Sequence, residues 1–168
     1  MKILHINGTA YGGTTNFIID LHEKLLDQKI ESFVYLPKKR NINNSLHPNS
    51  IFFKIQSIYK IITKKIINKL FFHNDQTFTL GIFKSYEIEK IIKEIKPDII
   101  NLHWIGNEFL SLNEIKKFNV PIVWTLHDMW VFLPIDHYLN KKIQTIGFPF
   151  KIISDYLYKF FLNKKKDF

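Results

Sequence analysis

Two short segments that are apolar nearly throughout constrain the fold of this chain more than any other feature. They are residues 98–103, with the sequence DIINLH, and residues 121–126, with the sequence PIVWTL. Strands of this kind are covered by helices on both faces, whereas a strand with one face in water alternates polar and apolar residues. A third apolar run, over residues 3–7, ends at an Asn-Gly pair that is typical of a turn. Together these segments predict a parallel sheet in an α/β protein.

The segment after the first apolar run predicts a βαβ unit. A glycine-rich loop over residues 8–13 leads into an amphipathic helix over residues 14–28, and a second strand follows over residues 32–36. Apolar residues recur in the helix every three or four positions, and Thr14 or Thr15 is placed to cap its first turn. Parallel strands need right-handed helical crossovers. We therefore predict a doubly wound α/β domain with a mostly parallel, Rossmann-like sheet.

Residues 51–72 form a long helical pattern that carries five lysines and no acidic residue. At about 100° per residue the lysines fall on one half of the helical wheel and several isoleucines on the other. A basic amphipathic helix can lie on an anionic membrane surface. The alternative is an ordinary surface helix whose apolar half packs on the sheet. The sequence does not decide between these two interpretations. Peripheral membrane contact through this helix is therefore one of its predictions.

The remaining elements are predicted from periodicity and turn signals. Two amphipathic helices are predicted over residues 85–96 and 111–118, and another in the tail over residues 150–168. Residues 77–80 are predicted to be a short strand, and residues 37–50 a polar loop.

The composition excludes several kinds of protein. Without any Cys, the chain forms no disulfide, has no thiolate nucleophile and offers no Cys-ligated metal site. The formal charge is +9, yet among the 24 basic residues only Arg40 is arginine. Because specific nucleic-acid binders depend on arginine for bidentate contacts, we expect no nucleic-acid partner. An AT-rich genome is an alternative, non-functional cause of the excess of lysine.

The sequence has no recognisable targeting segment. Its first residues are too polar for a signal peptide, and no stretch of about 18 apolar residues could span a membrane. We therefore expect a cytoplasmic protein, with the inner face of the plasma membrane as the place of any membrane contact.

The glycine loop follows the first predicted strand, and ligands bind beyond the carboxyl ends of strands in open parallel sheets. Gly12 and Gly13 precede a helix, so their backbone N–H groups could approach a phosphate or a sugar closely. A plain tight turn is the alternative, because the loop matches neither the dinucleotide-binding nor the Walker motif.

Histidine and tryptophan side chains follow two other predicted strands. His103 and Trp104 come after one, and His127 and Asp128 come after the other. A neutral imidazole can take a proton from a hydroxyl group or hold a sugar oxygen, and an indole ring can stack on a sugar face. The alternatives are a buried structural histidine and a tryptophan in the core or at its rim. No metal is expected, because the spacing of these residues matches no standard ligand motif.

Taken in order, these segments resemble one known family. The loop with Gly12 and Gly13, residues 98–105 and residues 121–130 are similar to the N-terminal domain of a GT-B-fold glycosyltransferase of family 4. The branch concerned builds bacterial exopolysaccharides of the colanic-acid type. The most specific part is WTLHDMW over residues 124–130, and the resemblance covers residues 1–138.

The resemblance implies one Rossmann-like half of the GT-B fold and a retaining transfer of a sugar. The donor would be a nucleotide-sugar and the acceptor a polysaccharide or a lipid-linked glycan, with no cofactor. His127 would contact the donor sugar in the active-site cleft, with Asp128 beside it, and these two are the predicted catalytic residues. The predicted substrate-binding residues are Gly12, Gly13, His103 and Trp104, the last two at the cleft rim.

The sequence departs from the family's pattern in two ways. After Trp130 the family continues with cysteines, and residues 131–138 contain none. The whole chain, residues 1–168, corresponds to the N-terminal, acceptor-side domain only, so we expect a truncated or split enzyme in which the second, nucleotide-sugar-binding domain is absent. The alternative is a non-catalytic remnant, or a binding subunit that needs a separate donor-binding chain.

Overall fold

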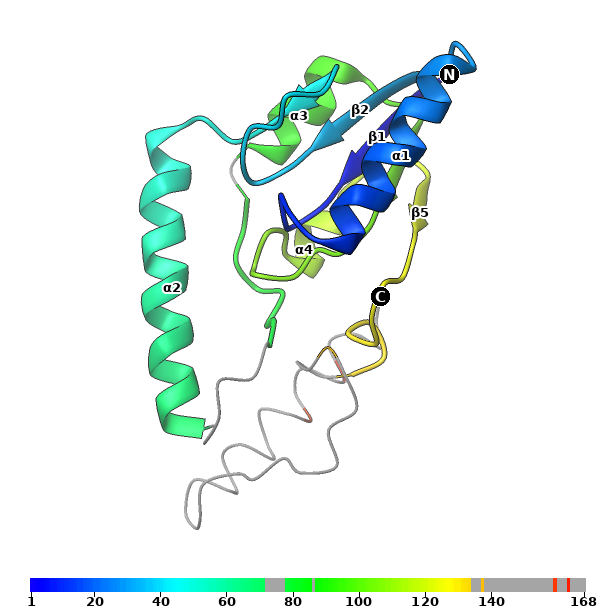
Figure 1. Cartoon of the computed structure of the whole chain (residues 1–168). Coiled ribbons are helices and arrows are strands. Elements are labelled where there is room, and N and C mark those ends of the chain that lie inside the picture. Colours follow the sequence, from blue (N-terminus) through cyan, green and yellow to red (C-terminus); the bar gives the residue numbers. More distant parts are fainter. Residues whose placement is uncertain (72–77, 86, 134–136, 138–158, 160–162, 164–168) are drawn as a thin grey trace. The chain divides into compact units, whose positions relative to one another are not determined.

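The structure, a computed structural model, describes residues 1–71, 78–85, 87–133, 137, 159 and 163. The chain divides into two compact units, Met1–Phe53 with Gly81–His127 and Lys54–Leu80 with Asp128–Phe168. In chain order the elements are β1 (Lys2–Ile6), α1 (Gly13–Asp27), β2 (Glu31–Tyr35), β3 (Ser45–Leu46), α2 (Ile51–Phe71), α3 (Ile88–Ile95), β4 (Ile99–Leu102), α4 (Leu112–Ile115) and β5 (Ile122–Trp124) (Figure 1).

The first unit is built on a five-stranded sheet in the order β3-β2-β1-β4-β5, and every neighbouring pair is parallel. The predicted Rossmann-like sheet is therefore confirmed. The register places Ile6 beside Tyr35 and Leu102, and Leu102 beside Trp124. The carboxyl ends of β1, β2, β4 and β5 consequently lie along one edge of the sheet. The glycine loop and two of the predicted histidines follow strands at this edge.

Apolar side chains pack on both faces of the sheet, as a doubly wound architecture requires. On one face, Val34 of β2 packs with Ile18 of α1, and α1 lies across this face (Figure 1). On the opposite face, Tyr35 is fully buried, and its ring centroid lies 5.1 Å from that of Phe109. Neighbouring residues of β2 thus face opposite ways, in keeping with the two-residue period of a strand.

The first turn of α1 differs from the prediction. Gly12 is the N-cap residue, with a φ of 95°, and no side chain caps the helix. Thr15 is buried instead, and its hydroxyl lies 3.1 Å from the carbonyl oxygen of Thr9 and 3.2 Å from that of Tyr11, as a donor to them. The prediction of a threonine cap is therefore wrong, because Thr15 closes the preceding loop rather than the helix.

Two predicted helices are shorter in the structure. Residues 85–96 contain α3, and residues 111–118 contain α4, which begins with a capping box between Ser111 and Glu114. Most of the predicted tail helix, over residues 150–168, lies outside the described residues, as does residue 77 of the predicted short strand.

Helix α2 confirms the long helix predicted over residues 51–72, but none of its apolar residues whose burial is described is buried. Lys60 is only 6% exposed, and Lys64 Nζ lies 4.9 Å from the centre of the Phe78 ring. The large apolar side chains that are 52–68% exposed are Ile51, Phe52, Ile55, Ile58, Tyr59, Ile61, Ile62 and Ile66. Within its own unit the apolar half of α2 is thus largely accessible, and the alternative that it packs on the sheet stays a prediction. Within the described part of the chain, no helix is long and apolar enough to cross a membrane.

Candidate functional site

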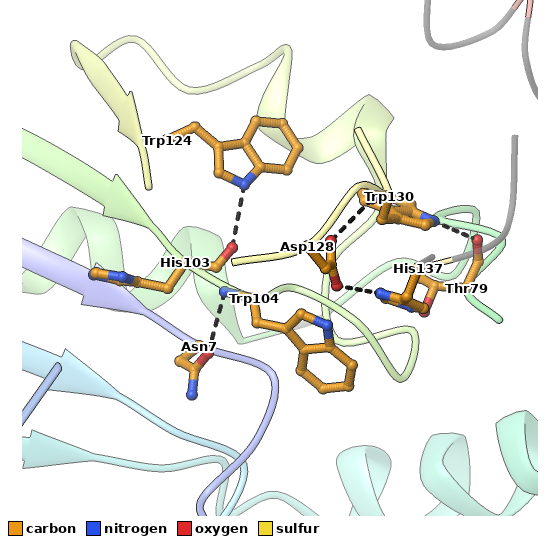
Figure 2. Close-up of polar contacts among 8 residues, drawn as sticks. All are labelled: Asn7, Thr79, His103, Trp104, Trp124, Asp128, Trp130 and His137. Atoms are coloured by element: carbon orange, nitrogen blue, oxygen red, sulfur yellow. Dashed lines mark hydrogen bonds and ion pairs between the residues drawn. The ribbon is translucent and has the colours of Figure 1, made fainter. Parts of the chain in front are cut away.

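The loop after β1 and the loop after β4 are joined by hydrogen bonds. The N–H group of Gly8 donates to the carbonyl oxygen of Trp104 at 2.5 Å, and the N–H group of Trp104 donates to Oδ1 of Asn7 at 3.2 Å (Figure 2). A Cβ atom on Gly8 would lie 2.6 Å from the carbonyl oxygen of Gly106. Real Cβ atoms do not approach backbone oxygens this closely, so the junction of the two loops requires glycine at position 8.

The glycine loop is anchored at its base and open at its end. Asn7 Nδ2 donates to the carbonyl oxygen of Thr9 at 2.8 Å and to the hydroxyl of Thr15 at 3.1 Å. In contrast, among the described residues nothing beyond the adjoining residues and the backbone of α1 lies within 4 Å of the place that a Cβ atom would take on Gly12 or Gly13. The first turn of α1 carries no acidic residue. The positive end of the helix dipole therefore lies beside open space without a neighbouring carboxylate from its own turn.

Three imidazole rings form a row at the same edge of the sheet, which we call the histidine row: His5, His103 and His127. His5 Nδ1 lies 3.1 Å from His103 Nε2, and His103 Nδ1 lies 3.1 Å from His127 Nε2. The ring centroids are 5.3 Å and 5.4 Å apart. Both separations between nitrogens are hydrogen-bond distances, so the row is a continuous hydrogen-bonded chain.

The row follows from the register of three neighbouring strands. His5 of β1 pairs with Asn101 of β4, which in turn pairs with Val123 of β5. Residues two apart in a strand share a face, so His103 lies one step beyond His5 on the same face. His127 follows β5 and extends the series. The ring of Phe17, from α1, packs edge-on against His103 and His127 with centroid separations of 6.2 Å and 5.5 Å, so the row lies on the face covered by α1.

Burial keeps the inner part of the row uncharged. His5 and His103 are each 1% exposed. Burial, assisted by the charge of His22, lowers the pKa of His5 to about 4. Burial, assisted by the charges of His5 and His127, lowers the pKa of His103 to about 3. Both rings are therefore neutral at physiological pH and can act as hydrogen-bond donors and acceptors.

Aromatic side chains surround the residues that follow β4. The indole N–H of Trp124 donates to the carbonyl oxygen of His103 at 3.1 Å (Figure 2). The ring of Trp104 lies against Gly106, where a Cβ atom would come within 2.3 Å of it. Trp104 is partly exposed. The loop thus holds the ring in place in a residue that is not fully buried.

Asp128, predicted to act beside His127, belongs to a polar cluster of the second unit. Its Oδ2 pairs with Nδ1 of His137, and its Oδ1 accepts the backbone N–H of Trp130 at 2.9 Å (Figure 2). His137 Nε2 lies 2.9 Å from the hydroxyl oxygen of Thr79, whose carbonyl oxygen accepts the indole N–H of Trp130 at 2.7 Å. Both carboxylate oxygens of Asp128 are therefore engaged in ordering its own segment.

The structure brings together two of the predicted residues, His103 and His127, and places Gly12 and Gly13 in the same unit. Sequence reasoning missed His5, which lies inside a strand and has the appearance of a core position. The signal that could have found it is its place one residue before the end of β1. Among the described residues, no three His, Asp or Glu side chains are arranged to hold a metal ion.

The parallel sheet, the open glycine loop before α1 and the polar side chains at the carboxyl edge define a Rossmann-like domain of the kind that forms one half of a GT-B enzyme. The model of the family described as Glycosyltransferase Family 4 matches residues 11–164. The chain belongs to this family, as the resemblance in its sequence predicted.

A similar curated protein is the "Putative colanic acid biosynthesis glycosyl transferase WcaC" of Escherichia coli strain K12. It is 25% identical over 146 residues, a match that covers 77% of this chain and 34% of the relative. The chain thus spans about one third of the length of this relative. No solved structure matches the chain significantly.

Proposed function

We propose that the chain provides the acceptor-side domain of a glycosyltransferase that moves a sugar from a nucleotide-sugar to a polysaccharide or lipid-linked glycan. The observation that carries the proposal is the histidine row, in which His127 and His103 meet at 3.1 Å at the edge where parallel sheets bind ligands. The family match over residues 11–164 supports glycosyl transfer. The name of the E. coli relative supports an exopolysaccharide as the product.

Each predicted site residue has a role in this proposal. His127 contacts the transferred sugar, His103 supports it at the cleft rim, and Trp104, a partly exposed residue, lines the same rim. The open space at Gly12 and Gly13 supports their role in holding donor phosphates or the acceptor through backbone N–H groups. Asp128 acts indirectly, because its carboxylate orders the segment that follows His127.

The donor nucleotide, in this proposal, binds mainly to a second Rossmann-like domain. The support is that the chain corresponds to 34% of the length of its E. coli relative. A separate donor-binding chain would serve the same purpose, in which case this chain acts as a binding subunit.

The proposal is tested by deleting the gene and restoring it as wild type or as His127→Ala. Membranes are supplied with radiolabelled nucleotide-sugars, and label in lipid-extractable glycan is measured. We expect deletion to abolish incorporation with one donor and the wild-type gene to restore it. His127→Ala should restore about 1% of it or less, because a positioned imidazole contributes about 100-fold or more to such reactions.

The matched control is His47→Ala, which changes a histidine outside the row and should transfer at the wild-type rate. Equal incorporation by the deletion strain and the wild type, for every donor tested, would refute the proposed function. Full activity of His127→Ala would refute the role of His127 alone.

We also propose that α2 lies on the inner face of the plasma membrane, where a lipid-linked acceptor would be found. The support is the exposure of eight large apolar side chains on this helix, together with exposed Lys54, Lys65 and Lys69. Apolar side chains of such a helix enter the interface while lysines contact anionic headgroups. Three lysines near the surface contribute about 3 kcal/mol, at about 1 kcal/mol each.

The membrane proposal is tested by flotation with vesicles of phosphatidylcholine, with and without phosphatidylglycerol. We expect binding that is about 100-fold tighter with the anionic lipid and weaker in high salt. Replacing Ile58 and Ile62 with Ser should weaken binding about 30-fold, through the loss of about 2 kcal/mol of apolar burial. The control pair Ile82→Ser and Phe132→Ser removes exposed apolar side chains outside α2 and should bind like the wild type. Absence of binding to anionic vesicles at low salt would refute the proposal.

A further inference from the structure

Two cations lie over the ring of one residue of the glycine loop. The guanidinium carbon of Arg40 is 5.1 Å from the centre of the Tyr11 ring, and Nζ of Lys38 is 5.9 Å from it. A cation within about 6 Å of an aromatic ring is attracted to the ring but keeps its positive charge. Tyr11 is exposed and directly precedes Gly12. Two positive charges are therefore held beside the open end of the glycine loop.

The loop that carries these cations connects β2 to β3 and is anchored at its far end. Ile42 packs against the apolar cluster of α1 and β2. The carbonyl oxygen of Asn43 can only accept a hydrogen bond, so the buried His22 donates to it from Nε2 at 2.9 Å. Asn44 Nδ2 donates to the carbonyl oxygen of Ser32 at 3.0 Å. The loop is thus ordered before any ligand binds, which lowers the entropic cost of binding.

The positive charge of this loop has no negative partner. Lys38, Lys39 and Arg40 follow one another in the sequence. Within the part of the chain that the structure describes, none of the three forms an ion pair with a carboxylate, and no acceptor takes the N–H groups of the Arg40 guanidinium. Like charges at short range repel one another, and an anion placed among them offsets that repulsion. The loop therefore has the charge of an anion site.

The arginine at position 40 indicates which anion fits. Arg40 is the one arginine among the 24 basic residues of the chain. Its planar guanidinium can bind two oxygens of a phosphate group at once, whereas the ammonium group of a lysine acts as a point charge. A diphosphate offers two adjacent phosphate groups, so that one can contact the guanidinium of Arg40 and the other the ammonium group of Lys38.

We propose that Arg40 and Lys38 bind a diphosphate group beside the glycine loop. Such a group occurs both in nucleotide-sugar donors and in the lipid carriers of glycan acceptors. The proposal deepens the proposed function, on which it rests for the source of the diphosphate. It assigns binding residues to the segment after β2, which the sequence indicated only as a polar loop.

The site is tested by calorimetric titration of the whole chain with inorganic pyrophosphate at low ionic strength. We expect a single pyrophosphate to bind, with an affinity that falls as salt is added, because the cations lie at the surface. Absence of binding at low salt would overturn the proposal. The measurement involves no sugar transfer, so its result does not depend on the proposed function.

Variants of Arg40 separate a site from general attraction of anions to a basic protein. Arg40→Gln should weaken pyrophosphate binding about 10-fold or more, because it removes a charged, bidentate partner. Arg40→Lys keeps the charge without the planar group and should recover only part of that loss. The matched control is Lys117→Gln, which removes the same charge from an exposed lysine after α4 and should bind like the wild type. Equal weakening by Arg40→Gln and Lys117→Gln would overturn the site.

Two variants of Tyr11 test the geometry of the site. Tyr11→Phe keeps an aromatic ring beside the cations and should bind pyrophosphate like the wild type. Tyr11→Leu removes the ring, so the two cations lose their common support and binding should weaken about 3-fold. Wild-type affinity in Tyr11→Leu would overturn the role of the ring in placing the cations.

The source of the diphosphate is decided with two further probes, uridine diphosphate and phosphatidylcholine vesicles that carry a prenyl diphosphate. Tighter binding of uridine diphosphate than of pyrophosphate would assign the site to the donor. Binding to the prenyl diphosphate vesicles above that to plain vesicles would assign it to the acceptor. In either case Arg40→Gln should bind the preferred probe about 10-fold less tightly. Wild-type binding of both probes by Arg40→Gln would overturn the proposal.

The site and the proposed function fail in different experiments. Pyrophosphate binding that depends on Arg40, in a chain whose gene deletion leaves sugar incorporation unchanged, would refute the proposed function and leave the site standing. Full restoration of sugar incorporation by an Arg40→Gln gene whose product has lost pyrophosphate binding would refute the place of the site in the reaction and leave the proposed function standing.

Discussion

Mild acid should unfold this protein. We expect the free energy of unfolding to fall by about 5 kcal/mol between about pH 7.5 and pH 4.5. The two responsible side chains are His5, with a pKa lowered to about 4, and His103, with a pKa lowered to about 3. In the unfolded chain both titrate near 6.5, so below that pH the unfolded state binds more protons than the folded state, and stability falls as pH falls. A loss of this size approaches the whole stability of a typical domain.

The acid sensitivity is measured by urea unfolding at several pH values across this range, with circular dichroism as the signal. The double variant His5→Gln and His103→Gln removes two titrating groups and keeps side chains that can donate and accept. We expect it to be less stable than the wild type near pH 7.5 but to lose much less stability on acidification. His22, whose pKa burial also lowers, accounts for part of the slope that remains. Equal slopes in the two proteins would show that the row is not the cause.

Much of the fold could be predicted because its strands are short apolar runs with clear ends. The runs at residues 3–7, 98–103 and 121–126 became β1, β4 and β5; β1 is shifted by one residue toward the N-terminus, and β4 and β5 are shorter than their runs. Strand β3, Ser45–Leu46, was not predicted, because two residues in a polar loop give no periodicity. Its formation depends on pairing with β2, which is a tertiary contact.

The orientation of α2 shows a different limit of sequence reasoning. Helical periodicity separates a basic half from an apolar half, but it does not say which half faces inward. The usual assumption is that the isoleucines are buried and the lysines exposed. In α2, however, Lys60 is buried while Ile58 and Ile62 are exposed. The apolar stem of a lysine can pack inside while its charge finds an aromatic ring, as Lys64 does over Phe78.

The sequence predicted the individual residues of the candidate site but not the contacts among their side chains. His103 and His127 follow strands that were assigned correctly, yet their contact depends on the strand order, which places β4 between β1 and β5. The same order adds His5 to the row. Asp128 was predicted to act beside His127 because the two are adjacent in sequence; the structure adds that its carboxylate pairs with His137, nine residues further on, which the sequence did not indicate.

The second large effect is expected at Gly8. In Gly8→Ala the new Cβ atom would lie 2.6 Å from the carbonyl oxygen of Gly106 and 3.0 Å from that of Trp104. Both are backbone atoms, so the two loops must separate, and the hydrogen bond from Gly8 to Trp104 is weakened or lost. Overpacking of this kind costs about 1–3 kcal/mol, and the lost hydrogen bond adds about 1 kcal/mol. We expect a loss of about 3 kcal/mol or more in urea unfolding.

The other glycines of the loop serve as controls with graded expectations. Gly12→Ala places an alanine at a φ of 95° and a ψ of −179°, a backbone region essentially restricted to glycine, which should cost about 1–3 kcal/mol of strain without a clash with any described residue. Gly13→Ala introduces neither strain nor a clash, because no described residue outside its own helix and its chain neighbours comes within 4 Å of its Cβ position. Its stability should therefore match or slightly exceed that of the wild type.

Gly13→Ala separates a ligand-binding loop from a plain tight turn. If the backbone N–H groups at the start of α1 hold a phosphate or sugar, a methyl group in the open space above them keeps the ligand at a distance, and sugar transfer should fall about 10-fold in a fully stable protein. If the loop is only a turn, the same variant should transfer sugar like the wild type. Destabilisation by Gly13→Ala equal to that by Gly8→Ala would contradict the geometry on which both expectations rest.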